Sequence, residues 1–170
     1  MRHIISVLLE NEPGALSRVS GLFSARGYNI ESLTVAPTND STLSRMTIVT
    51  IGDDRKIDQI EKQLNKLIDV VALHDITVNQ HIEREIALVK VSIESDQREE
   101  LDRVVDAFKA ILIESAGAAA DDSQFIIEMS GSGEKVDELI KALSNLEIIE
   151  IARSGATGLA SGARALTTTN

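Results

Sequence analysis

The chain has 170 residues, a length that allows one domain or two small ones. Hydrophobic residues make up 43%, enough for a core, but aromatic residues make up only 2%, so this core must be aliphatic. The net charge of −10 argues against a nucleic-acid-binding protein, because phosphate contacts require a face rich in lysine or arginine. The absence of cysteine excludes disulfides and thiolate metal sites.

The N-terminus shows no targeting signal. Residues 1–5 lead directly into an expected strand, without an apolar signal segment before it. No apolar run approaches the roughly 20 residues that are needed to span a bilayer. We therefore expect an acidic cytoplasmic protein that does not enter a membrane.

The first half of the chain predicts the order β-α-β-β-α-β, the split βαβ or ferredoxin-like arrangement. Pro13-Gly14 breaks the first apolar run, and apolar residues at helical spacing then lead to a glycine stop at Gly27. The second helix has the clearest apolar period in the chain. In chain order after the first helix, the predicted segments are a strand at 30–35, a strand at 43–51, a helix at 57–68 and a strand at 70–78.

The second half repeats this order without obvious sequence identity. Its predicted segments are strands at 85–93, 111–113, 124–129 and 147–152, and helices at 97–110 and 133–143, with a flexible turn at 117–123. Polar residues at 79–84 separate the halves. We therefore predict an α+β protein with two ferredoxin-like domains, 1–79 and 84–153. Residues 154–170 show neither period and predict a flexible tail.

Each predicted sheet carries helices on one face only, so its other face needs cover. The side chains expected on those faces are a mixture of apolar and small polar types. Pairing between sheets, face to face or edge to edge, is the expected solution.

The turn at Pro13-Gly14 is the strongest candidate for a binding site. The first N–H groups of a helix have no partner within the helix, and a glycine leaves them accessible, which suits a small carboxylate. Asn11 offers a side-chain amide that both donates and accepts. On spacing alone, a plain β-α turn is the favoured interpretation.

A resemblance to a known family changes this balance. Over most of the first half and in patches of the second, the chain resembles the small regulatory subunits of acetolactate synthase (acetohydroxyacid synthase). The matching segments are residues 10–19, 21–36, 43–48, 59–70, 84–85, 88–91 and 151–155. The alanine-rich turn near Ala118 and the residues from Thr167 to Asn170 depart from the family pattern.

The resemblance implies that the first domain is an ACT domain, which pairs side by side with a second copy in a homodimer. It also implies an effector site for a branched-chain amino acid, valine, at the dimer interface. One protomer contributes the helix start and the other the start of the second strand; the residues are Asn11, Gly14, Ala15, Leu16, Asn29 and Ile30.

The family also implies a function. The chain is then a non-catalytic subunit that activates a large catalytic subunit and confers feedback inhibition by valine. That partner carries thiamine diphosphate, FAD and magnesium, and it condenses pyruvate with pyruvate or 2-oxobutyrate in the synthesis of valine, leucine and isoleucine. We expect no cofactor in this chain.

The chain's own residues predict no catalytic or metal site. His3, His74 and His81 have no second ligand at metal spacing, and there is no phosphate-binding glycine loop or nucleophile constellation. The alternative is a free-standing ACT-type amino-acid sensor that acts on a transcription or degradation system. Co-purification with a large thiamine-dependent subunit discriminates between the two. An RNA-binding role is less favoured, because stacking aromatics and positive charge are lacking.

Overall fold

The computed structural model describes residues 1–114, 123–162 and 165–167. The chain divides into two units, one made of Met1–Glu83 with Ala156–Asn170 and the other of Arg84–Gly155. The boundary between Glu83 and Arg84 lies inside the polar stretch at 79–84 that separates the two halves of the sequence. Each unit has its own sheet and its own core.

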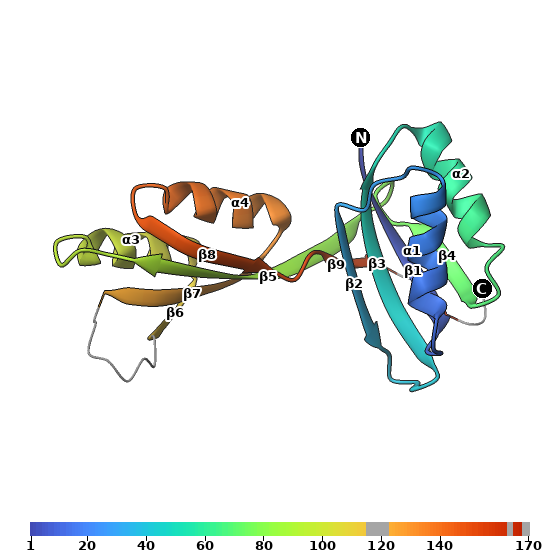
Figure 1. Ribbon diagram of the computed structural model, residues 1–170, viewed down its shortest axis with the longest axis horizontal. Coiled ribbons are helices and arrows are strands. Elements are labelled where there is room, and N and C mark those ends of the chain that lie inside the picture. Colours follow the sequence, from blue (N-terminus) through green and yellow to red (C-terminus); the bar gives the residue numbers. More distant parts are fainter. Residues whose placement is uncertain (115–122, 163–164, 168–170) are drawn as a thin grey trace. The chain divides into compact units, whose positions relative to one another are not determined.

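The first unit has the predicted order β-α-β-β-α-β. Its elements are β1 (Arg2–Glu10), α1 (Ala15–Ala25), β2 (Ser32–Pro37), β3 (Leu43–Ile51), α2 (Asp54–Leu64) and β4 (Val70–Asp75). The four strands form an antiparallel sheet in the order β2-β3-β1-β4, with both helices on one face (Figure 1). The predicted ferredoxin-like arrangement is confirmed for this unit.

Strand β1 lies in the middle of this sheet and is buried on both faces. It pairs with β3 along its whole length, from Arg2 opposite Ile51 to Glu10 opposite Leu43. Ile5, Val7 and Leu9 pack into the aliphatic core beneath the helices, and the alternate side chains face the other way. Burial on both faces explains why the sequence of β1 is a continuous apolar run.

The chain's own C-terminal segment covers the second face of this sheet. Ala156 packs with Ile4, Val49 and Ile76 in a separate small core. It is followed by β9 (Thr157–Ala160), which pairs with the beginning of β5. Both Ala156 and Leu166 are buried.

The sequence shows no strand period over residues 154–170, yet residues 157–160 form a strand. A four-residue strand is too short to show an alternating pattern, and this one contains Gly158. A Cβ atom at Gly158 would lie 2.8 Å from Ile76 Cδ1, so the segment lies close to the sheet and a side chain there would have to displace Ile76. Gly158 therefore lets the segment fit against the sheet and at the same time interrupts any strand pattern in its sequence.

The second unit repeats the topology of the first. Its elements are β5 (His81–Ser92), which begins in the first unit, α3 (Arg98–Phe108), β6 (Ile111–Glu114), β7 (Gln124–Gly131), α4 (Gly133–Ala142) and β8 (Glu147–Arg153). The sheet order β6-β7-β5-β8 matches that of the first unit (Figure 1). This confirms the predicted structural repeat. The turn predicted at 117–123 lies, except for Ser123, outside the described residues.

The sheet face of the second unit that points away from its core carries apolar side chains. Ile86, Leu88 and Ile113 are each exposed to 39% or more. Lys90 lies among them, opposite Ile126 on β7 and Glu150 on β8. Cover for this face by another sheet stays a prediction.

Candidate effector site

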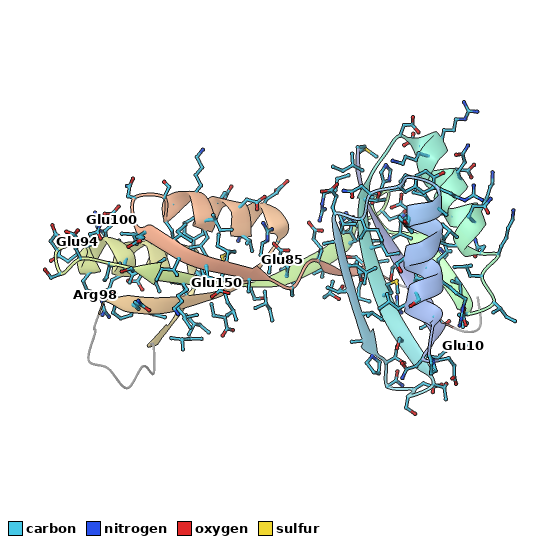
Figure 2. The ribbon with its side chains drawn as sticks, in the orientation of Figure 1. Glu10, Glu85, Glu94, Arg98, Glu100 and Glu150 are labelled. Atoms are coloured by element: carbon cyan, nitrogen blue, oxygen red, sulfur yellow. The ribbon has the colours of Figure 1, made fainter. Side chains whose placement is uncertain are left out.

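The candidate site begins where β1 ends and α1 starts, beside Glu10 (Figure 2). Gly14 is the N-cap residue of α1, with φ 91° and ψ −12°, the left-handed conformation that strongly favours glycine. No side chain caps the helix, and its first turn contains no acidic residue. The positive end of the helix dipole is therefore not neutralised by the helix's own side chains.

Two backbone donors at this helix start are free. The N–H of Ala15 donates to Glu12 O at 3.2 Å, and that of Arg18 donates to Gly14 O at 2.9 Å. The N–H groups of Leu16 and Ser17 have no hydrogen-bond acceptor among the described residues. Two adjacent free donors suit the two oxygens of a carboxylate.

Asn11 is engaged with the chain that leads into β3. Its backbone N–H donates to Thr42 O at 2.7 Å, and its Nδ2 donates to Ser41 O at 3.0 Å. Its Oδ1 accepts from Ser44 Oγ at 3.1 Å. Since an amide has two N–H groups and two oxygen lone pairs, Asn11 keeps capacity for a ligand while it holds the 41–44 segment beside the turn.

An ion pair that the sequence analysis did not identify lies next to Gly14. Arg18 binds the carboxylate of Asp69 with two hydrogen bonds, Nε to Oδ2 at 2.5 Å and Nη2 to Oδ1 at 2.7 Å. These bonds lower the pKa of Asp69 and raise that of Arg18. A Cβ atom at Gly14 would lie 2.8 Å from Arg18 Nη1, so the guanidinium lies close to the helix start.

Only one signal in the sequence could have indicated Arg18. It lies four residues after Gly14, one helical turn along, within the segment that resembles the family. Its partner is 51 residues away and has no local pattern that marks it.

Ala15 and Leu16 offer different groups to a ligand. Ala15 is buried in the core, so only its backbone is available. The Leu16 side chain is 43% exposed and can contact an aliphatic ligand. The structure therefore brings Gly14, Ala15 and Leu16 together in one turn, with Asn11 close behind in the chain.

Asn29 and Ile30 lie beyond the opposite end of α1. This helix has 11 residues, which at about 1.5 Å per residue separates its two ends by roughly 16 Å. Asn29 Nδ2 donates to Glu31 Oε1 at 2.6 Å, and Ile30 packs against the core. Within one chain, these two residues are not brought to the Gly14 turn.

The described residues hold no group of three or more histidine, cysteine or acidic side chains that could bind a metal ion. Over the same part of the chain, no helix has both the length and the apolar character needed to cross a bilayer.

Comparisons with known proteins show which family this chain resembles. Residues 5–72 match the model of the AHAS small subunit-like ACT domain, and residues 84–162 match that of the small subunit of acetolactate synthase. The chain is 50% identical over 163 residues to the acetolactate synthase isozyme 3 small subunit of Salmonella typhimurium, with 95% of this chain and 97% of that protein covered.

A more distant relative and a solved structure show the same similarity. A probable acetolactate synthase small subunit of Methanothermobacter thermautotrophicus is 40% identical, over 96% of this chain and 95% of its own. The crystal structure of the acetolactate synthase small subunit from Thermotoga maritima superimposes with a TM-score of 0.84 and 35% identity, and covers 96% of this chain and 99% of its own.

Proposed function

Because this chain belongs to the acetolactate synthase small-subunit family, we propose that it is the non-catalytic subunit that activates the large catalytic subunit and confers feedback inhibition by valine. The family and its ACT domain imply a regulatory role and a large-subunit partner. Thiamine diphosphate, FAD and magnesium belong to that partner in this proposal. This chain binds the effector and contacts the large subunit, and that contact transmits the effect of effector binding.

One observation carries the site assignment: α1 begins at Gly14 with two free N–H groups and no acidic side chain in its first turn. The carboxylate of valine accepts from Leu16 N–H and Ser17 N–H in this arrangement. The aliphatic side chain of valine lies against Leu16.

The site is completed by a second copy of the chain. Asn29 and Ile30 lie a helix length away from the Gly14 turn, so they reach a ligand there only from another protomer. Strand β2, which follows them, is at the edge of its sheet, and an edge strand offers unpaired backbone groups to a neighbour. Two ACT domains paired side by side bring the two half-sites together.

The proposal is tested by titrating valine against the purified chain, with and without a matching large subunit, while binding and activity are read together. We expect the chain alone to be inactive, to raise the activity of the large subunit, and to make that activity sensitive to valine. Turnover of pyruvate by the isolated chain would contradict the non-catalytic role.

A further inference from the structure

A cavity of about 270 Å³ lies within the first unit, between its sheet and the C-terminal segment. Its polar lining comes from Ser6, Arg45 and His74, and its apolar lining includes Ile76, Leu159 and Leu166. We call it the C-terminal cavity. It is on the sheet face opposite α1, because Arg45 precedes Met46, which packs under the helices, and neighbouring side chains on a strand point to opposite faces.

The guanidinium of Arg45 is the distinctive group in this cavity. Its Nη1 donates to Ser6 Oγ and its Nη2 to the Leu166 carbonyl, both at 2.9 Å. Both acceptors are neutral, and no carboxylate among the described residues forms an ion pair with Arg45. By contrast, Arg2, Arg18, Arg98 and Arg153 each pair with an aspartate or a glutamate.

A partly buried charge without a counter-ion is unfavourable, because it has lost part of its hydration and gained nothing of opposite sign. Burial accordingly lowers the pKa of Arg45 from its ordinary value. The guanidinium has five N–H donors, and two of them are used. The other three have no acceptor among the described residues.

We propose that the C-terminal cavity binds a small carboxylate with a short aliphatic body. Its carboxylate lies against Arg45 and accepts from the Ser6 hydroxyl, and its carbon chain lies against Ile76, Leu159 and Leu166. A volume of about 270 Å³ is large enough for a molecule of a few carbons.

The lining excludes two other ligand classes. None of the described residues that line the cavity is an aspartate or a glutamate, so the ammonium group of an amino acid has no counter-charge and lies near Arg45. Inorganic phosphate gains one guanidinium but loses hydration against apolar walls. The ligand is therefore a carboxylic acid without an amino group, and this site is separate from the proposed valine site.

The test uses butyrate as the probe and the full-length chain, with binding measured by heteronuclear NMR and calorimetry. We expect saturable binding, with shifts at Ser6, Arg45 and His74. Butanol, which has the same carbon chain without the charge, should bind at least tenfold more weakly. A dissociation constant for butyrate above ~20 mM overturns the proposal.

Two variants act on different features of the cavity. Arg45→Gln removes the charge, and Ala160→Leu fills space in the lining while the guanidinium stays. Each should weaken butyrate binding about tenfold or more. Arg45→Gln loses a hydrogen bond to a charged group, and Ala160→Leu occupies the space of the ligand. If Arg45→Gln does not fold, Ala160→Leu still decides. Unchanged affinity in the folded variants overturns the assignment.

Gly14→Asp is the control for the proposed effector site. It should lose valine binding and keep butyrate binding, and valine should not compete with butyrate. Competition by valine, or phosphate binding as tight as that of butyrate, overturns the proposed ligand class. Failure of the valine site alone leaves butyrate binding and its dependence on Arg45 as they were, so the two proposals fail separately.

Discussion

At the residue scale, Gly14 meets two requirements, one of backbone conformation and one of space for a ligand. Its φ of 91° strongly favours glycine, and its missing side chain keeps the helix start open. Any substitution therefore has two effects, backbone strain and occupation of the proposed ligand space. Alanine and aspartate share the first effect and differ in charge, which makes them a matched pair.

We predict that Gly14→Asp abolishes the valine response and leaves activation of the large subunit intact. Its carboxylate competes for the free N–H groups and repels the carboxylate of the ligand. Gly14→Ala should weaken valine binding less. Both variants should lose about 1 kcal/mol of unfolding free energy, because residues other than glycine are strained at positive φ. Calorimetry with valine and urea denaturation measure the two effects. Unchanged valine affinity in Gly14→Asp would place the effector site elsewhere.

The Arg18–Asp69 pair predicts a pH dependence of stability. Its hydrogen bonds hold the pKa of Asp69 below its ordinary value of 3.8. A carboxyl whose folded-state pKa is depressed contributes stability that is present above its unfolded pKa and is lost as pH falls through the folded value. Wild type should therefore lose unfolding free energy below about pH 4 more steeply than Asp69→Asn.

Urea denaturation at a series of pH values measures this difference. Glu61 acts in the opposite direction, because burial raises its pKa, and its contribution is lost as pH rises through the folded value. Since Glu61 is present in both proteins, its effect cancels in the comparison. Parallel pH curves for wild type and Asp69→Asn would show that the ion pair does not stabilise the fold.

At the scale of elements, β9 is held by its fit to the sheet beneath it. The N–H of Gly158 donates to Thr47 Oγ1 at 3.3 Å, and the Thr34 hydroxyl donates to the Ala156 carbonyl at 2.8 Å. We predict that Gly158→Val lowers the unfolding free energy by about 1–3 kcal/mol, because its Cβ overlaps Ile76 and must displace it.

Gly21→Ala is the matched control. Nothing lies within 4 Å of a Cβ at Gly21, in the middle of α1, so this change should raise stability by about 0.5–1 kcal/mol. Urea denaturation measures both variants. Equal effects of the two changes would mean that β9 does not pack tightly against the sheet.

In the second unit, three elements meet at one arginine. Arg153 on β8 pairs with Glu85 on β5, which is labelled in Figure 2, and donates to Asp137 on α4 at 2.6 Å. The Glu85 side chain is only 6% exposed. Arg153→Met should lower the stability of this unit by about 2 kcal/mol, since it leaves a buried carboxylate unpaired.

The double variant Glu85→Gln with Arg153→Met should recover part of that loss, because the buried charge is removed along with its partner. Thermal denaturation of the single and double variants measures the coupling. A double variant no more stable than Arg153→Met alone would mean that the unpaired charge is not the cause.

At the scale of the whole molecule, a site shared between two copies links effector binding to association. A ligand that binds only the dimer stabilises the dimer by mass action. We predict that saturating valine tightens self-association of wild type by roughly tenfold, a coupling of about 1.4 kcal/mol. Sedimentation with and without valine measures it. Gly14→Asp should dimerise equally with and without valine; a shift in this variant would argue against the shared site.

The C-terminal segment also contributes to the stability of the first unit. A fragment that stops near residue 78 contains all six elements of the ferredoxin-like unit. It lacks Ala156 and β9, so Ile4, Val49 and Ile76 lose their cover. We expect a lower melting temperature for this fragment than for the full chain, read by circular dichroism.

The sequence by itself determined the features that depend on local order. Apolar periods of two and 3.6 residues, with breaks at Pro13-Gly14 and Gly27, predicted the strands and helices of both units and their repeated topology. The Gly14–Leu16 part of the proposed site lies within one turn of chain, so the sequence alone could indicate it. Only the tertiary structure decided how β9 covers the sheet, which carboxylate pairs with Arg18 and what surrounds Arg45. The Arg18–Asp69 and Arg45–Leu166 contacts, for example, join residues 51 and 121 positions apart. Such pairs leave no periodic pattern in the sequence, because each partner is chosen by its place in the folded chain.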